Sequence, residues 1–235
     1  QGLTANSSGI TTFSQGIGQV TPLGAFATDA VGSTVLYADV DTQDSGISIA
    51  DSITLQASVS IATNAATTAG DITLGAITGG TYTLAVETGA AVANADATIA
   101  SFNGTGNLTL QNIGGTATVS GTTQATTVSL ATVATAIFSG AVTATTLTVP
   151  ARVGSLSLNG GSGTITNAVT FDNTGALNLG AAGGALTFNG GLTENAGGLV
   201  TLRGTIQASD DSISFGDVSL GAATAMLFVM PIRWI

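Results

Sequence analysis

Apolar and polar residues alternate in short runs along most of this 235-residue chain. Runs such as Ile72-Thr-Leu74, Leu108-Thr-Leu110 and Leu156-Ser-Leu158 place an apolar residue on either side of a polar one. Alternation with a period of two is typical of a strand that has one buried face. Gly, Asn, Ala or Ser follows most runs, and these residues turn a chain at low energetic cost. The pattern therefore predicts many short strands joined by tight corners.

Corresponding strands recur about every 20 residues, which is a period typical of repeats that coil and stack on one another. Leu110 to Leu130 and Leu158 to Leu179 are examples of this step. We therefore predict an all-β fold, a right-handed parallel β-solenoid (β-helix) with coils of about 20 residues. Stacking strands about 4.8 Å apart would pair all backbone groups except those of the terminal coils. The same short strands also allow the alternative of one or more antiparallel β-sandwich domains.

Three segments in which Asn-Gly follows an apolar residue are the strongest repeated matches, and we interpret them as structural corners. Glycine supplies the positive φ that a sharp turn needs, and asparagine can hydrogen-bond along the stack to its copy in the next coil. The predicted corner residues are Asn103, Gly104, Asn159, Gly160, Asn189 and Gly190.

The pattern divides the chain into three segments. Residues 1–34 are rich in Gly, Ser and Thr, which predicts an irregular N-terminal cap or adapting segment. Residues 35–221 form the predicted solenoid. Residues 222–235 are an apolar tail that we interpret as a cap, a docking segment or a boundary artefact, because an exposed apolar patch favours association. The assembly residues expected in this tail are Leu227, Phe228 and Trp234.

Charge is scarce and mostly negative. Thirteen carboxylates against three arginines give a formal net charge of -10, and charged residues make up only 7% of the chain. Neutralising phosphates requires a basic stripe, so we expect no nucleic-acid partner. No run reaches the roughly 18 apolar residues of a membrane helix, so we expect no membrane-spanning segment. A mean hydropathy of +0.50 is too high for a solvated coil and indicates a folded chain.

The missing residue types exclude much catalytic chemistry. With no His and no Cys, the chain cannot form a Ser-His-Asp triad, a cysteine nucleophile or the usual zinc site. Paired carboxylates could hydrolyse glycosides, but neighbouring strand residues point to opposite faces, so Asp210 and Asp211 would not converge on a strand. We therefore expect no enzyme and no catalytic residues.

Asp39, Asp41 and Asp44 form the metal candidate. Carboxylates spaced by two and three residues in a turn can hold Ca²⁺, with backbone carbonyls completing the shell. The segment lacks the glycine and distal glutamate of an EF-hand, and solvated acidic turns are common. Calcium is the one cofactor that the sequence suggests.

Several repeats resemble those of very large bacterial surface proteins, the filamentous-haemagglutinin-type and autotransporter-like adhesins. The segments that carry the resemblance include Gly70-Asp-Ile-Thr-Leu74, Ser155-Leu-Ser-Leu-Asn-Gly-Gly161 and Leu186-Thr-Phe-Asn-Gly-Gly-Leu192. The likeness covers roughly residues 45–221 and lies in the style of the repeats. It implies a secreted right-handed β-helix at the surface of a Gram-negative bacterium, used for adhesion, aggregation or matrix building.

We therefore expect a non-enzymatic extracellular protein, a rigid solenoid segment of a bacterial surface adhesin. The expected partners are copies of itself, through the solenoid ends or the tail, and a surface glycan or protein receptor. An alternative is a self-assembling extracellular filament or surface-layer subunit, because uncapped strand edges can stack end to end. A lesser alternative is a β-helix that binds or cleaves polysaccharide, which a groove lined by Tyr37, Tyr82 and Asp residues would favour.

Overall fold

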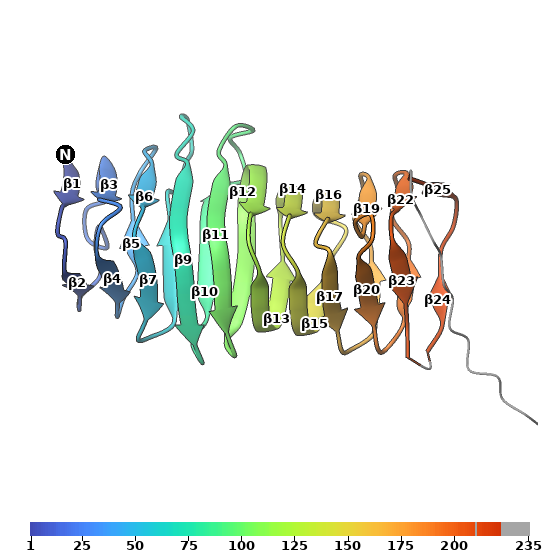
Figure 1. Ribbon diagram of the computed structural model, residues 1–235. Helices are drawn as coiled ribbons and strands as arrows, with labels where there is room; N and C mark the ends of the chain where they lie inside the picture. The colour runs from blue at the N-terminus through green and yellow to red at the C-terminus, as the bar shows by residue number, and fades with distance from the viewer. Residues whose placement is uncertain (210, 222–235) are drawn as a thin grey trace, which may run out of the picture.

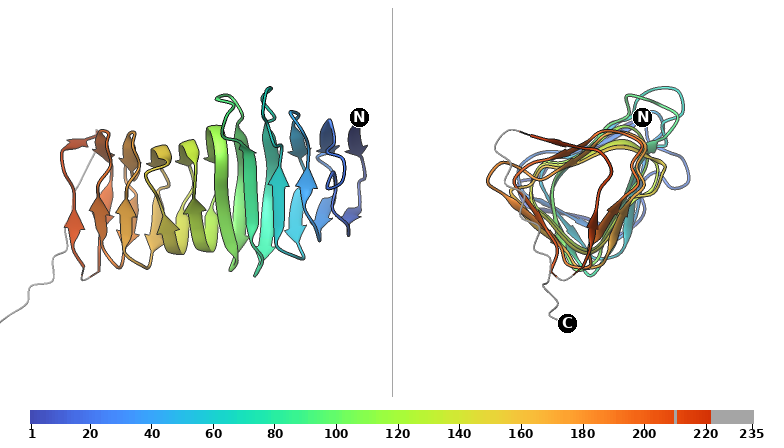
Figure 2. Two further views of the ribbon diagram at one scale, coloured as in Figure 1. Left: turned by 180° about the vertical axis from the view of Figure 1, so that it is seen from behind. Right: turned by 90° about the vertical axis from the view of Figure 1, so that its right-hand side faces the viewer.

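The chain folds as a rod of stacked coils. A computed structural model describes residues 1–209 and 211–221, and all regular secondary structure in them is β-strand. The chain winds through about 10 turns, with coils about 21 residues apart (Figure 1). Seen along the stack, the coils share a roughly three-sided outline (Figure 2). The predicted parallel β-solenoid is confirmed, and the strand pairs of the described residues are parallel, which rules out the antiparallel sandwich.

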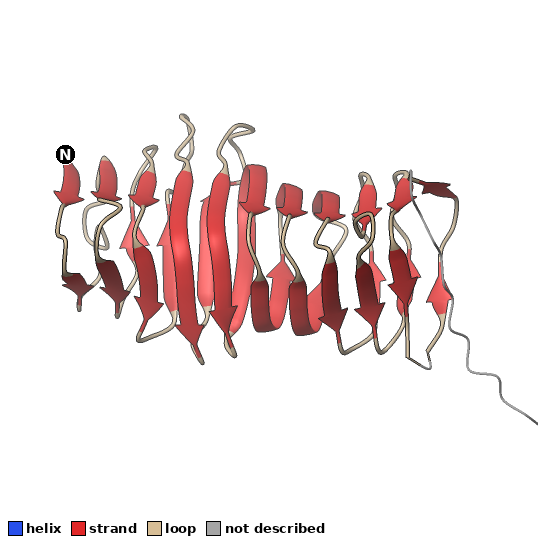
Figure 3. Cartoon of the chain, viewed as in Figure 1, coloured by secondary structure: helices blue, strands red, loops and turns tan. Residues whose placement is uncertain are grey.

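Each face of the rod is a column of parallel strands separated by corners and loops (Figure 3). The first face contains β1 (Gly2–Ala5), β3 (Ala25–Thr28), β6 (Ile47–Ile49), the start of β9 (Ile72–Gly80), the start of β11 (Ala97–Gly104), the end of β12 (Asn107–Val119), β14 (Val133–Phe138), β16 (Val153–Leu158), β19 (Leu177–Leu179), β22 (Val200–Leu202) and β25 (Val218–Leu220).

The second face contains β2 (Ile10–Phe13), β4 (Ser33–Leu36), β7 (Ser52–Leu55), the ends of β9 and β11, the starts of β13 (Thr123–Leu130) and β15 (Val142–Thr148), β17 (Ser162–Ile165), β20 (Ala185–Phe188) and β23 (Thr205–Gln207). The third face contains β5 (Val40–Asp41), β8 (Val59–Ala62), β10 (Leu84–Gly89), the start of β12, the ends of β13 and β15, β18 (Val169–Phe171), β21 (Leu192–Glu194) and β24 (Ile213–Ser214).

One apolar core runs through the interior of the coils. It extends from Phe26 to Ile206, because alternation along each strand directs every second side chain inward. The pairs that the sequence suggested, Leu110 with Leu130 and Leu158 with Leu179, are direct register partners. The largest fully buried side chains are the five phenylalanines Phe26, Phe102, Phe138, Phe171 and Phe188. Burial of one such side chain contributes roughly 1.5–3 kcal/mol to stability.

Residues 1–34 differ from the predicted irregular cap. Strands β1 and β2 pair in parallel with β3 and β4, so this segment already belongs to the solenoid. Its strands contain few large apolar side chains, so the alternation of apolar and polar residues that predicts a strand is weak there. The Phe13 ring packs edge to face on Phe26 with ring centroids 5.3 Å apart, and this contact with the next coil helps to order the segment.

Two loops protrude at the corner between the third and first faces, at residues 64–70 and 90–96 (Figures 1 and 2). A buried threonine closes the base of each loop. Thr63 Oγ1 donates to Gly70 O at 2.7 Å, and Thr88 Oγ1 donates to Ala95 O at 2.9 Å. These hydroxyls satisfy carbonyl groups that the loops remove from the strand ladder.

The corner between the first and second faces depends on a column of three glycines. A Cβ on Gly160 would lie 2.3 Å from the Gly140 carbonyl oxygen, and a Cβ on Gly140 would lie 2.2 Å from that of Gly121. The φ angle of Gly160 does not lie in the positive range. Glycine is therefore needed at this corner because the coils approach closely, and not for the positive φ that the sequence analysis assumed.

The three predicted Asn-Gly corners do not stack on one another. Asn159 follows β16 at the corner between the first and second faces. Asn189 follows β20 at the corner between the second and third faces, and Asn103 with Gly104 ends strand β11. The expected asparagine ladder is therefore wrong. Unlike polar side chains link the coils instead, as when Asn178 Nδ2 donates to Ser157 Oγ at 3.0 Å.

Replacing Gly160 by alanine is expected to lower the free energy of unfolding by roughly 1–3 kcal/mol, because the new methyl group overlaps stacked backbone. Gly161→Ala is the matched control, since a Cβ there meets no atom within 4 Å. Urea unfolding of both variants measures the difference. Equal stability of the two variants would contradict the close-approach explanation.

Two buried threonines give opposite expectations when each is replaced by valine. The Thr123 side chain is 1% exposed and its hydroxyl has no partner among the described residues, so Thr123→Val should raise stability by about 1 kcal/mol. Thr63→Val should instead lower stability by roughly 1–3 kcal/mol, because it leaves the Gly70 carbonyl without its donor. Thermal unfolding should shift the two variants in opposite directions from the wild type, and a shift of both in the same direction would disprove this assignment.

Candidate functional site

Most of the 13 carboxylates hold neighbouring coils together. Each accepts a hydrogen bond from a residue about one coil away, such as Asp71 Oδ1 from the amide of Asp96, 25 residues further on. Charge-assisted bonds of this kind are stronger than neutral ones. The carboxylates that act in this way are Asp29, Asp39, Asp41, Asp44, Asp51, Asp71, Glu87, Asp96, Asp172 and Glu194.

The three calcium candidates each bind a different part of the solenoid. Asp39 Oδ1 accepts from the Ser60 amide at 2.7 Å, and Asp41 Oδ2 accepts from Gln19 Nε2 at 2.7 Å. Asp44 Oδ1 accepts from backbone amides of the protruding loop at residues 66–68. In the described part of the chain, no group of three or more acidic side chains is placed to hold a metal ion. Calcium binding therefore stays a prediction, without a grouped set of ligands.

Asp44 and Asp41 have shifted pKa values of opposite sign. The backbone amides of Thr67, Ala66 and Thr68 hold the pKa of Asp44 well below its usual range. Burial, followed by the nearby Asp39 carboxylate, raises the pKa of Asp41. The fold therefore favours the charged form of Asp44 and the protonated form of Asp41.

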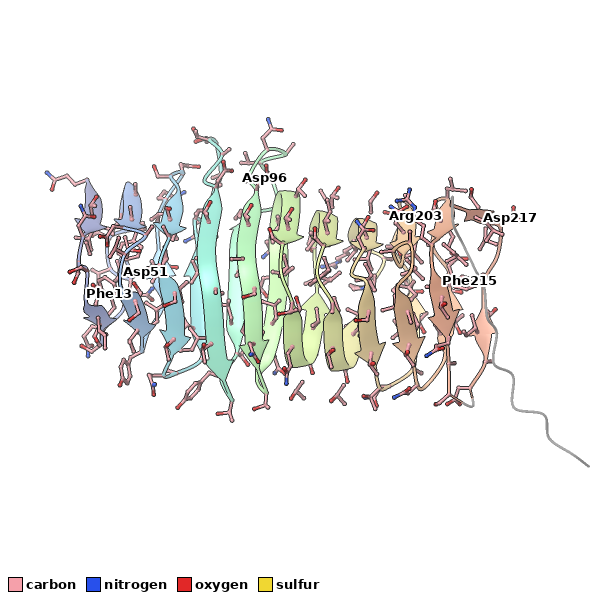
Figure 4. The ribbon with its side chains drawn as sticks, in the orientation of Figure 1. Phe13, Asp51, Asp96, Arg203, Phe215 and Asp217 are labelled. Atoms are coloured by element: carbon pink, nitrogen blue, oxygen red, sulfur yellow. The ribbon has the colours of Figure 1, made fainter. Side chains whose placement is uncertain are left out.

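Asp51 is buried in the interior of the N-terminal coils, with 4% of its surface exposed (Figure 4). Its two oxygens accept from the hydroxyls of Thr28 at 3.2 Å and Thr34 at 3.0 Å. Both threonines are themselves buried, so the network is enclosed. It joins β3 and β4 to the corner before β7 and has the geometry of a structural contact.

A notch lies at the corner between the first and second faces, toward the C-terminal end of the described rod. Asn159, Gly180 and Arg203 occupy equivalent positions on three successive coils. Backbone bonds fix this alignment, since Gly180 N donates to Leu158 O at 2.8 Å and Arg203 N donates to Leu179 O at 2.9 Å. Because the middle coil carries glycine, it contributes no side chain at this position to the space between the other two. The resulting hollow has a volume of about 490 Å³ and is also lined by Ala181 and Ala182.

Arg203 lines this notch toward the C-terminal end of the described rod (Figure 4). A Cβ on Gly221 would lie 2.7 Å from Arg203 Cγ and 2.9 Å from its Nε, so the arginine stem packs along the backbone of the next coil. Among the described residues, its guanidinium has no carboxylate or other hydrogen-bonding partner. The Asn159 side chain is exposed and likewise has no partner there.

Register supplies the signal that would have found this site. Leu158, Leu179 and Leu202 are partners on the first face, and the residue after each of them lines the notch. The step from Leu158 to Leu179 is evident in the sequence, but its continuation to Leu202 is not, because this interval is 23 residues long. Asn159 was therefore predicted only as a structural corner.

Other parts of the surface have simpler chemistry. A hollow of about 230 Å³ on the second face is lined by threonines, including Thr126, Thr143 and Thr145, and has no charged lining residue. Tyr37 is exposed and Tyr82 packs against the core, and neither lines this hollow or the notch. Asp210 and the predicted assembly residues, Leu227, Phe228 and Trp234, lie outside the described residues.

No protein-family model, curated protein or solved structure matches the chain. The adhesin likeness therefore rests on the style of the repeats, while the solenoid architecture stands on the structure itself.

The described residues contain no helix long and apolar enough to cross a membrane.

Replacing Asp44 by asparagine is expected to reduce the loss of stability at acid pH. The folded pKa lies below the unfolded value of about 3.9, so the charged form stabilises the fold above that pH, and this contribution disappears as the pH falls. Asparagine also tolerates the φ of 51° at this position, so the substitution mainly tests the charge. Urea unfolding at pH 7 and about pH 3 should show a larger drop for the wild type than for the variant.

Asp217→Asn is the control for this measurement, because Asp217 is exposed and has no partner among the described residues. This variant should keep the pH dependence of the wild type. An unchanged pH dependence in Asp44→Asn would contradict the role assigned to the loop amides.

Proposed function

We propose that the chain is a non-enzymatic structural segment of an extracellular bacterial adhesin. In this role the solenoid acts as a stiff rod that spaces and displays binding sites at the cell surface. The observation that carries the proposal is the continuous apolar core, which joins all the central coils into one body. The resemblance of the repeats to bacterial surface adhesins supports the extracellular and adhesive parts of the proposal.

The bonds between coils support a role in which stiffness matters. Carboxylates, threonine hydroxyls and amide side chains link adjacent coils in addition to the strand ladders. A coil therefore cannot separate from its neighbour without breaking ladder bonds, side-chain bonds and core packing together. Such a body resists bending and local opening better than separate domains on flexible linkers.

We propose end-to-end self-assembly into an extracellular filament as the second candidate function. The open end of the first coil exposes Leu3 by 40%, although its register partner Phe26 is buried, and the last described coil exposes Leu220 by 58%. No charged side chain occurs before Asp29, so charged residues that commonly block strand edges are missing from the first coil. An edge of this kind accepts a further coil of a longer polypeptide as well as a second copy.

The rod proposal is tested by small-angle X-ray scattering and electron microscopy of the 235-residue chain. We expect single stiff particles with a solenoid length of about 50 Å, from roughly ten coils at the strand spacing. Flexible or irregular particles would argue against both candidate functions. Particles joined end to end would favour the filament, and comparison with and without a calcium chelator would show whether the acidic turn takes part.

An edge variant separates stacking from general adhesion between particles. Leu3→Lys places a charge on the open end of the first coil, where the Leu3 side chain is 40% exposed, and should abolish any end-to-end stacking. Val20→Lys places the same charge on a side chain that is 99% exposed outside the strands and should leave stacking unchanged.

A further inference from the structure

We propose that the notch between Asn159 and Arg203 binds an acidic saccharide, through the carboxylate and a hydroxyl of one sugar ring. The proposal rests on the adhesive role proposed above and names a class of ligand for it. It concerns one corner of the rod that spans three coils, and it needs no residue outside the described part of the chain.

The spacing of the coils gives the notch the width of a small ligand. Asn159 and Arg203 lie two coils apart, which places their backbones about 9–10 Å from each other. Gly180 stands between them without a side chain, and its positive φ of 83° makes replacement by other residues costly. The floor is therefore backbone and two alanines, and the hollow of about 490 Å³ is within the usual size of ligand sites.

The arginine supplies recognition of a carboxylate. A guanidinium presents a planar fork of donors that matches a carboxylate in two parallel hydrogen bonds. In this acidic chain Arg203 is nevertheless unpaired within the described residues, so its donors are available to a ligand. The stem packs along Gly221 of the next coil, so the side chain must rotate toward Gly180 for its fork to contact a ligand in the notch.

The asparagine and the absence of carboxylates favour a sugar that carries a single acid group. The Asn159 amide has both a donor and an acceptor, the combination that suits a sugar hydroxyl. No carboxylate of the described residues lines the hollow, so one ligand carboxylate meets no repulsion from them. A densely charged polyanion would also interact with the net charge of -10, and this disfavours it as the ligand.

The test is an NMR titration of the isotopically labelled full chain with glucuronate and galacturonate, using glucose and acetate as comparison ligands. We expect saturable shifts of the backbone amides of Gly180, Ala181, Ala182 and Arg203 with the acidic sugars. Glucose should give no such shifts, and acetate should bind more weakly than either acidic sugar, because it lacks the hydroxyl that Asn159 would bind.

Variants assign the binding to the notch. Arg203→Gln should weaken it by about tenfold or more, since it removes a charge-assisted contact. Arg203→Lys should fall between this variant and the wild type, because lysine keeps the charge but loses the fork. Ala182→Leu fills the hollow without changing charge and should weaken binding as well. Arg152→Gln removes an exposed arginine elsewhere and should bind as the wild type does.

Three results would overturn the proposal. Equal affinity of Arg203→Gln and the wild type would place binding elsewhere, and equal affinity for acetate and glucuronate would reduce the notch to a simple anion site. An absence of saturable shifts would show that the notch does not bind these acidic sugars. In each case, stiff single particles in the scattering experiment would leave the rod proposal intact, so the two failures are distinguishable.

Discussion

Parallel stacking of coils at a spacing of about 4.8 Å is the constraint that shapes every other feature of this rod. Each residue lies directly against its counterparts in the coils before and after it, so a position must suit its whole column. Inward positions become columns of Leu, Val, Ile and Phe because an apolar column excludes water from end to end. At the first corner the same spacing brings Gly160 against the Gly140 carbonyl, where a methyl group has no room.

The distribution of acidic residues follows from the same constraint. Carboxylates are frequent from Asp29 to Asp96, where loops lengthen the coils and remove amides from the strand ladder. Residues 97–171 contain none, and paired strand residues within that stretch are 19 to 21 positions apart, as in compact coils. A carboxylate on one coil satisfies an amide that the neighbouring loop leaves unpaired. The negative charge is therefore explained in large part by backbone that needs acceptors.

The alternation of apolar and polar residues was sufficient to predict the architecture. It was not sufficient to predict which residues stack on one another in successive coils. The step from Leu110 to Leu130 could be read from the sequence because both runs are short and strongly apolar. The strands before residue 34 were missed because small residues, chiefly Thr and Ala, outnumber large apolar ones in them, and their order depends on the next coil. The predicted asparagine ladder was wrong for another reason. Asn103 and Asn189 occur in similar sequence segments but at different positions around the coil.

A shared register also explains why the candidate binding site was hidden. In a solenoid, residues that meet on the surface are separated by one or two whole coils, so a site leaves no contiguous motif. A uniform column produces a smooth corner, and recognition requires a departure from uniformity. Asn159, Gly180 and Arg203 form such a departure, since the glycine contributes no side chain and stands between an asparagine and an arginine in the column. The repeat that stiffens the rod thus also fixes the backbone spacing of Asn159 and Arg203, whereas a flexible loop would lose entropy in holding two residues at a set distance.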